Sequence, residues 1–279
     1  MDGSFDLYGG PSPAGPVVVS VPHAGRDYPL SLRAALSVPM RAVLPLEDRH
    51  IDAVALAART DETMLVQRRA RAWIDLNRSE DERDPRIDEG AHPTRHPFAS
   101  AKVKSGLGLV PRRATGATIL WSRRFADDDI RARIVGDHRP YHAALARALA
   151  LARDRFGTAI LLDLHSMPSL ASGATVVIGD RFGRTAAARF VARAEGAARQ
   201  AGLTTAINLP YAGAHILATH GRPAEGVHAI QIEIDRALYL DRAHDQTGDG
   251  LPRIAAMLRT MIAALSDEAL GQRYDCAAE

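Results

Sequence analysis

The stretch AILLDLHSMP, residues 159–168, decides the fold. It opens with four apolar residues in a row, without the alternation of a half-exposed strand. This pattern is typical of a strand buried on both faces of a parallel sheet. His165 follows near the carboxyl end of the run. In an open α/β sheet the ligand crevice lies outside the carboxyl ends of the strands, so His165 is expected at the edge of such a crevice.

Three other segments repeat this arrangement of an apolar run that ends in polar side chains. They are VVVSVPHAG (17–25), AWIDLNR (72–78) and HAIQIEIDR (228–236). These runs deliver His23, Asn77 with Arg78, and Glu233 at or near their carboxyl ends. Imidazoles, a carboxylate and a guanidinium gathered at one sheet edge indicate a metal hydrolase that acts on an anionic substrate.

Strand-like and helix-like segments alternate along the chain. Strands are predicted over residues 16–21, 63–67, 72–76, 159–164, 174–180, 203–209 and 228–234, and helices over 47–59, 127–156, 185–200 and 251–265. The helical stretch 127–156 is interrupted near Gly136 and Pro140, and residues 210–221 are expected to form a turn-rich loop. Such alternation implies parallel crossover connections. We therefore expect an α/β fold, a single three-layer domain over residues 1–279 whose mixed, largely parallel central sheet is covered by helices on both faces.

Residues 79–116 are polar, rich in Pro and Gly, and without a sustained period. Long irregular segments in compact domains are usually binding loops or lids. We expect a loop-rich insertion near the active site that covers the substrate. Lys102 and Lys104 within it are expected to be solvated loop charges.

Composition excludes several classes of function. The 279 residues carry 35 basic and 33 acidic side chains, a net charge of +2, which argues against a nucleic-acid partner. Cys276 is the single cysteine, so no intrachain disulfide can form. No segment approaches the length of apolar sequence that spans a bilayer. A cytoplasmic protein without membrane contact is expected, and a homo-oligomer stays open.

The candidate metal ligands come from separate segments. A hydrolytic Zn²⁺ site has three protein ligands, His nitrogens or carboxylate oxygens, and leaves one position for water. His23 and His165 are the imidazole candidates, and the acidic cluster Glu47, Asp48 and Asp52 offers the carboxylate. The alternative for that cluster is complementing a helix dipole.

Two further aspartates have open roles. Asp163 lies two residues before His165, on the same strand face, where it could orient a ring or hold a nearby helix start. Asp75 is expected to brace the loop that follows it.

Glu233 interrupts the otherwise apolar run 230–234. A buried, unpaired charge is costly, so this carboxylate should face a polar cavity, where it could act as a general base. The alternative is a salt bridge with Arg236 or Arg78.

Arg78 and His142 are candidates for the substrate pocket. A guanidinium can hold a substrate carboxylate through two hydrogen bonds, although a solvent-facing Arg is the commoner case. His138 and His142 stand four residues apart, a spacing that can chelate a metal ion. The motif lacks a catalytic Glu, so His142 is placed instead in the pocket wall or in support of it.

Six motifs resemble the N-formylglutamate amidohydrolase family, and they follow that family's order. They are SVPHAG, LEDRHID, WIDLNR, RPYHAAL, LLDLHSMP and HAIQIEIDRALYLD, and the resemblance covers residues 17–241. More distantly, DLNR and DLH are similar to pieces of aspartoacylases and succinylglutamate desuccinylases. The resemblance implies the zinc-carboxypeptidase type of α/β fold. It also implies a metal-dependent amidase that removes a small acyl group from an acidic amino acid, such as formate from N-formylglutamate in histidine breakdown.

The resemblance also implies roles for individual residues. The metal ligands would be His23, Asp48 and His165, holding one divalent ion, with Zn²⁺ expected. The general base would be Glu233, and Asn77 and Arg78 would meet the substrate carboxylate, with Arg236 and His142 as further substrate contacts. Two departures bear on this reading. Arg26 stands where aspartoacylases have a ligating Glu, and loop 210–221 is shorter than the glycine-rich loop of formylglutamate enzymes.

Two other functions stay open. One is a zinc carboxypeptidase or cell-wall peptide amidase that uses the same centre on a larger substrate. The other is a non-catalytic relative that binds carboxylates without turnover.

Overall fold

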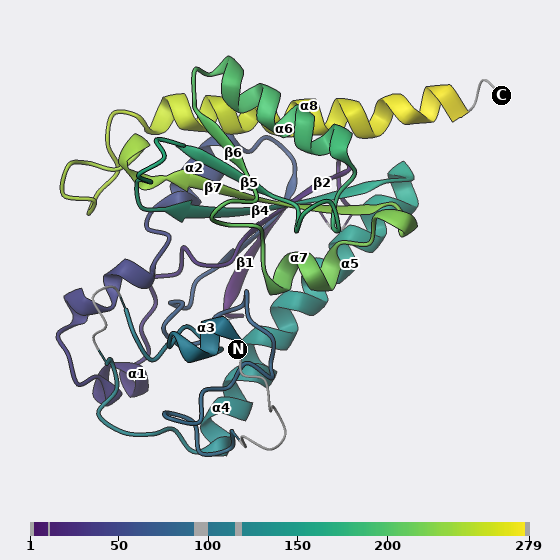
Figure 1. Ribbon diagram of the computed structural model, residues 1–279. Coiled ribbons are helices and arrows are strands. Elements are labelled where there is room, and N and C mark those ends of the chain that lie inside the picture. The colour runs from purple at the N-terminus through teal and green to yellow at the C-terminus, as the bar shows by residue number, and fades with distance from the viewer. Residues whose placement is uncertain (1–2, 11, 92–99, 115–118, 277–279) are drawn as a thin grey trace.

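A computed structural model of the chain shows a mixed sheet between two layers of helices (Figure 1). It describes residues 3–10, 12–91, 100–114 and 119–276, the last five by their backbone alone. These residues form a seven-stranded sheet of order β1-β3-β2-β4-β7-β5-β6. The strands are β1 (Phe5–Tyr8), β2 (Val17–Val21), β3 (Thr63–Gln67), β4 (Ala159–Met167), β5 (Val176–Gly179), β6 (Thr205–Ile207) and β7 (Val227–Asp235).

The sheet is largely parallel, as the sequence predicts. Strands β3, β2, β4 and β7 run parallel to one another, and β5 pairs with β6 in parallel. The two antiparallel pairs are β1 with β3 and β5 with β7. The expected mixed, largely parallel α/β sheet is therefore confirmed.

Helices cover both faces. The α-helices are α1 (Leu30–Ala35), α2 (Ile51–Ala58), α3 (Ala101–Lys104), α4 (Asp127–Arg133), α5 (Arg139–Phe156), α6 (Ala188–Gln200), α7 (His215–His220) and α8 (Leu251–Cys276). Shorter helical turns are η1 (Met40–Ala42), η2 (Leu44–Leu46), η4 (Ile134–His138), η5 (Pro223–Glu225) and η6 (Arg236–Leu238). Among the helices described, none has the length and apolar character that crossing a membrane requires.

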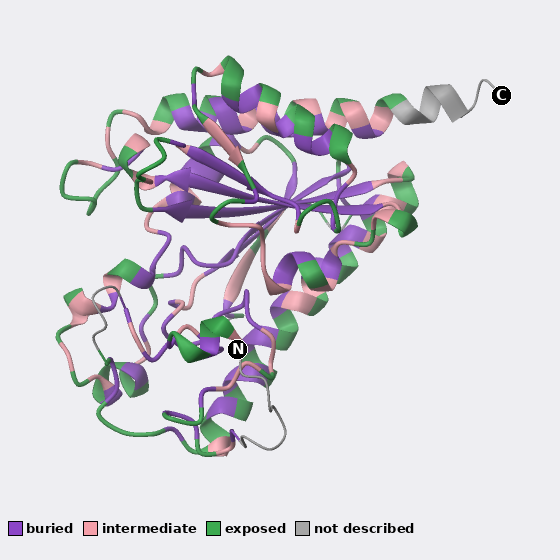
Figure 2. Cartoon of the chain, viewed as in Figure 1, coloured by how far each residue is buried: buried purple, intermediate pink, exposed green. Residues whose placement is uncertain are grey.

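Alternate residues of the central strands face two separate cores. In β2, Val17 and Val19 pack with α2, α6 and α8, whereas Val18 packs with α1, α5 and α7. Figure 2 shows the central strands buried almost throughout, between helices whose outer sides are exposed. A strand covered on both faces has no polar side to expose, which explains the continuous apolar runs in the sequence.

Strand register brings the polar residues of the central strands together. Ser20 of β2 lies opposite Asp163 of β4, which lies opposite Gln231 of β7. Two residues further along, His165 lies opposite Glu233. Because side chains alternate across a strand, both rows project to the same face of the sheet.

The predicted strand 72–76 is wrong. Residues 71–73 and 76–77 form turns instead, with a hydrogen bond from the Asp75 amide to the Leu109 carbonyl at 2.7 Å. The alternating Ala72, Ile74 and Leu76 are buried, but in the core under α5. The segment therefore bonds to the 79–116 insertion through Asp75 and does not join the sheet.

Some predicted boundaries also differ. Helix α2 begins at Ile51 rather than at residue 47, β6 is shorter than 203–209, and α8 continues past residue 265. The predicted loop 210–221 contains the six-residue helix α7. The interruption predicted near Gly136 is a π-helical turn, η4, between α4 and α5.

Candidate active site

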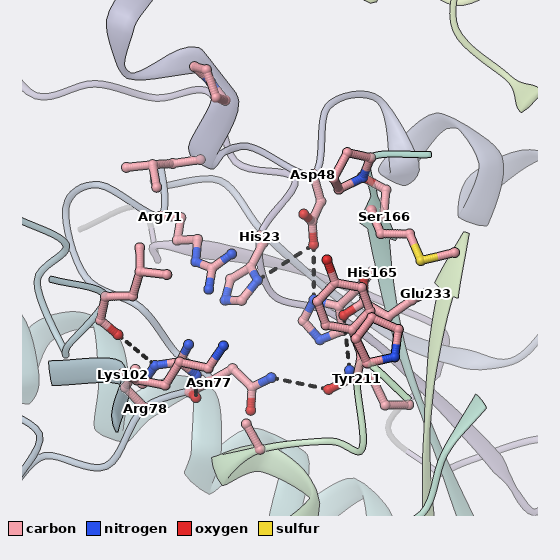
Figure 3. Close-up of a pocket in the computed structure, with 18 of the residues that line it drawn as sticks. His23, Asp48, Arg71, Asn77, Arg78, Lys102, His165, Ser166, Tyr211 and Glu233 are labelled. Atoms are coloured by element: carbon pink, nitrogen blue, oxygen red, sulfur yellow. Dashed lines mark hydrogen bonds and ion pairs between the residues drawn. The ribbon is translucent and has the colours of Figure 1, made fainter. Parts of the chain in front are cut away.

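A cavity of about 660 Å³ opens at the carboxyl ends of the central strands. Its lining includes three groups of polar side chains, most of which Figure 3 shows. His23, His165 and Glu233 come from the strand ends, Arg71, Asn77 and Arg78 from the 71–78 turn, and Lys102 and Arg113 from the insertion. The cavity thus gathers the side chains that the sequence places at separate strand ends.

His23, Asp48 and His165 converge on one point in this cavity. The Oδ2 atom of Asp48 lies 2.9 Å from His165 Nδ1 and 3.5 Å from His23 Nδ1 (Figure 3). One ligand atom of each residue lies within 4.8 Å of the other two, and all three residues are buried. Two imidazoles and one carboxylate are a common ligand set for a hydrolytic metal ion.

Each histidine is held by a second carboxylate. His23 Nε2 donates to Asp75 Oδ1 at 2.7 Å, and His165 Nε2 donates to Asp163 Oδ2 at 2.9 Å. Ser20 Oγ in turn donates to Asp163 Oδ1 at 2.8 Å. Histidines that bind metals usually donate their other ring N–H in this way, which fixes the tautomer and the ring orientation.

The Nδ1 atom of His23 indicates that the three residues fit a metal ion. This atom is buried and has no hydrogen-bond partner among the described residues. Because Nε2 carries the proton donated to Asp75, the neutral ring has its lone pair on Nδ1, facing Asp48. A buried acceptor without a partner is costly, and a cation at this point would satisfy it.

At the site, histidines shift the pKa of Asp48 and carboxylates shift the pKa of His165. Burial opposes ionisation of Asp48, but hydrogen bonds and charge from His165 and His23 outweigh it and hold its pKa below the usual range. Burial likewise disfavours the charged form of His165, yet Asp163 and Asp48 raise its pKa above the usual value. Two carboxylates therefore favour a positive charge between them, which is the electrostatic requirement of a cation site.

The other two acidic candidates are engaged elsewhere. Glu47 accepts hydrogen bonds from Tyr28 and Arg49. Asp52 forms a two-pronged ion pair with Arg26. Of the three carboxylates considered from the sequence, Asp48 is the one that the structure places against both histidines.

Glu233 lies beside this centre, with 9% of its surface exposed. Burial raises its pKa to about 7, against the opposing effect of His165. Its Oε1 accepts a hydrogen bond from Gln231 Nε2 at 2.9 Å. The alternative ion pair with Arg236 or Arg78 is absent among the described residues, and Arg236 instead lies 3.8 Å from Asp48.

Asn77 and Arg78 reach the cavity from the 71–78 turn. Asn77 Oδ1 accepts the Ile216 amide at 2.9 Å, and its Nδ2 donates to Gln231 at 3.4 Å. Arg78 donates to the carbonyls of Leu107 and Asn77, and 4% of its surface is exposed. The resemblance assigns both residues to a substrate carboxylate, and both line the cavity.

The N-formylglutamate amidohydrolase family model matches residues 15–240. The chain belongs to this family. It is 28% identical over 242 residues to the N-formylglutamate deformylase of Pseudomonas putida, a match that covers 83% of this chain and 84% of that protein. The corresponding protein of Pseudomonas aeruginosa is 28% identical over 236 residues, covering 81% and 82% of the two chains.

Solved structures agree with this assignment. The crystal structure of N-formylglutamate amidohydrolase from Ralstonia eutropha superposes with a TM-score of 0.83 at 35% identity, covering 94% of this chain and 97% of that one. A gene product of Agrobacterium tumefaciens has the same fold, with a TM-score of 0.70 at 20% identity over 96% and 95% of the two chains. The chain therefore has an α/β fold and belongs to a family of hydrolases that act on an amide bond.

Sequence reasoning missed several basic residues of this family member's cavity. Arg71 lines it and donates through Nε to Asp75 at 2.8 Å. Lys102 is exposed, as expected of a solvated loop charge, but it also lines the cavity. Burial, Arg78 and Arg71 lower the pKa of Lys102. The one sequence signal for Arg71 is its position four residues before Asp75. The positions of Lys102 and Arg113 depend on how the insertion folds, so no local pattern indicates them.

His142 lies outside the cavity lining, behind the turn that carries Asn77. Its Nε2 donates to the Leu76 carbonyl at 2.9 Å, and its Nδ1 lies 2.9 Å from His220 Nε2. Both ring nitrogens of His142 therefore bind groups outside the cavity. The structure does not place His142 in the direct contact with a substrate that the sequence suggests. Arg236, by contrast, lines the cavity and stays a candidate for substrate contact.

Proposed function

We propose that this chain is a metal-dependent deformylase that hydrolyses the amide bond of N-formylglutamate, giving formate and glutamate. The observation that carries the proposal is the cavity itself. It contains two histidines and the Asp48 carboxylate, which can bind a metal ion, next to the buried carboxylate of Glu233. Several Arg and Lys side chains also line it. Family relatives named for this reaction support the choice of substrate.

His23, Asp48 and His165 would hold the metal ion, which we infer to be Zn²⁺. When bound there, a divalent ion would polarise the scissile carbonyl and lower the pKa of a water molecule. Asp75 and Asp163 keep the ring N–H groups of the two histidines turned away, so that their Nδ1 atoms face the centre.

Glu233 would act as the general base. A carboxylate with a pKa of about 7 can take a proton from water near neutral pH and return it to the leaving amine nitrogen. The Gln231 amide holds Oε1 of Glu233, and Asn77 in turn holds Gln231. This chain of amides fixes where the base lies.

The cations of the cavity would recognise the two carboxylates of the substrate. Five Arg or Lys side chains but two carboxylates stand among the described lining residues. Arg78 is buried at the end of the 71–78 turn and can bind one carboxylate, and Lys102 with Arg113 can bind the other. Arg71, fixed by Asp75, is placed to stabilise negative charge on the carbonyl oxygen.

The insertion argues for a small substrate. Residues Lys102, Ser105, Leu107, Arg113 and Ala114 form part of the cavity wall. We infer that residues 79–116 cover the substrate, although residues 92–99 and 115–116 lie outside the described part. This wall favours an N-acyl amino acid over the longer substrates of a carboxypeptidase or a peptide amidase, and Glu233 favours turnover over binding alone.

The test is a Glu233→Gln variant, assayed with N-formylglutamate beside the wild type and chelator-stripped protein. The variant should lose activity by about 10²- to 10⁴-fold, since a positioned base contributes that much, and should keep its metal. Stripped protein should be inactive until a divalent ion is restored. Full activity in the stripped protein would contradict the proposed metal dependence, and loss of metal from the variant would make Glu233 a ligand.

The acyl group is tested with a matched panel of N-formyl, N-acetyl and N-succinyl glutamate. The N-formyl compound should give the highest kcat/KM. A preference for a larger acyl group would replace the proposed substrate while keeping the reaction class.

A further inference from the structure

A second group of histidines lies behind the turn that presents Asn77 and Arg78. His138 ends the π-helical turn η4, His142 lies one turn further along in α5, and His215 begins α7. One ring nitrogen of each lies within 4.8 Å of the other two. None of the three lines the active-site cavity, so this cluster is separate from the first centre.

Two of the rings are held in one orientation by backbone carbonyls. His138 Nε2 donates to the Arg78 carbonyl at 2.8 Å, and His142 Nε2 donates to the Leu76 carbonyl at 2.9 Å. Because each Nε2 carries the donated proton, the lone pair of each neutral ring is on Nδ1. A backbone carbonyl is one of the usual partners for the distal N–H of a metal-binding histidine.

The His138 ring carries the clearest sign of a missing partner. Its Nδ1 atom is buried and accepts no hydrogen bond from any described residue, and 3% of the residue is exposed. The rings are also closely associated, with centroids of His138 and His142 4.4 Å apart and those of His142 and His215 5.2 Å apart. A buried lone pair beside two other imidazoles is an arrangement that a cation would stabilise.

We propose that His138, His142 and His215 form a second binding site for a divalent transition-metal ion, with Zn²⁺ as the first choice. Imidazole nitrogens suit Zn²⁺, Cu²⁺ and Ni²⁺, whereas Mg²⁺ and Ca²⁺ take oxygen ligands. Histidines four residues apart on a helix can share one ion. The π-helical turn belongs to the same pattern, since such turns are frequent at functional sites.

The charge state of the cluster suits ligation. Burial lowers the pKa of all three histidines, so the rings are neutral and keep their lone pairs at pH 7. Glu80 Oε1 lies 3.9 Å from His138 Nδ1 and offers an oxygen as a fourth ligand, in exchange for its ion pair with Arg139. An ion on His142 Nδ1 would displace the hydrogen bond that His220 makes there.

The site would have a structural effect on the active site. His142 and His138 hold the carbonyls of Leu76 and Arg78, on either side of Asn77. An ion that locks the two rings would therefore fix the turn that presents Asn77 and Arg78 to the cavity.

The experiment counts bound ions. Protein stripped with a chelator is dialysed against Zn²⁺, and the ions per chain are measured by plasma mass spectrometry. The wild type should hold two. His138→Phe and His215→Ala should each hold one, His23→Ala should also hold one, and the pair His23→Ala with His215→Ala should hold none.

His244→Ala is the matched control, because His244 is an exposed histidine remote in sequence from both groups, and it should keep two ions. Circular dichroism establishes that each variant is folded, and His215→Ala, at a half-buried position, decides the matter if His138→Phe does not fold. An ion count in folded His215→Ala equal to that of the wild type would overturn the second site. If the active-site residues bind no ion, His23→Ala will instead hold as many ions as the wild type.

Discussion

At the scale of single residues, each candidate metal-binding histidine is paired with an aspartate that accepts a hydrogen bond from its other ring nitrogen. His23 with Asp75, and His165 with Asp163, make the same arrangement from different parts of the chain. The Asp163 pair could be predicted as one of two alternatives, because both residues lie on one strand face. The Asp75 pair could not, since it joins residues 52 apart through a turn that the sequence pattern presents as a strand.

Replacing either supporting carboxylate should weaken the metal site. Asp75→Asn and Asp163→Asn should each lower metal affinity by about 10- to 100-fold, because the paired histidine loses the acceptor that orients it. The affinity is measured by competition with a chelator of known strength. Asp52→Asn is the control, since Asp52 pairs with Arg26 away from the histidines, and its affinity should match the wild type. Equal affinities in all three variants would contradict the supporting role.

At the scale of elements, the central strands were predictable and the turns that complete the site were not. Long apolar runs have no alternative to burial in the sheet, so β2, β4 and β7 are found where the sequence predicts them. The segment 72–76 also has strand-like alternation, but its backbone partner is Leu109 in the insertion. Local pattern carries no information about such a partner, nor about the six-residue helix α7.

The short helix α3 offers a matched test of what the insertion recognises. Lys102 and Lys104 are both exposed, but Lys102 lines the cavity near Arg78 and Arg71, whereas Lys104 lies outside the lining. Lys102→Met should lower kcat/KM for N-formylglutamate by about tenfold, the equivalent of about 1.4 kcal/mol of lost charge-assisted binding. The same variant should change kcat/KM for N-formylglutamine much less, because that substrate lacks the second carboxylate.

Lys104→Met should leave both substrates unaffected. Equal losses for the two substrates in Lys102→Met would place Lys102 in general binding rather than in recognition of the second carboxylate.

At the scale of the whole molecule, the two faces of the sheet meet different demands. The face covered by α2, α6 and α8 is an apolar core, while the opposite face carries the polar rows that end in His165 and Glu233. A strand can serve both because its side chains alternate. The sequence shows this division directly, as single polar residues spaced by two within otherwise apolar runs.

His228 connects this packing to the stability of the molecule at acid pH. The residue is buried at the start of β7 and packs against Phe190 with the rings tilted and their centroids 4.6 Å apart. Its Nδ1 accepts the Ala187 amide at the start of α6, at 3.2 Å. Burial lowers the pKa of His228 to about 4, below the value of about 6.5 expected in the unfolded chain.

Since the folded state holds this proton less tightly, unfolding takes up a proton between these two pH values. The contribution of His228 to the free energy of unfolding is therefore complete above pH about 6.5 and falls as the pH drops toward 4, by at most about 3 kcal/mol. Urea denaturation of the wild type and His228→Gln at pH 7.5 and 4.5 measures it. The variant should lose less stability on acidification than the wild type, while His244→Gln, at an exposed position, should follow the wild type. Identical losses in the wild type and His228→Gln would mean that protonation of His228 does not oppose folding.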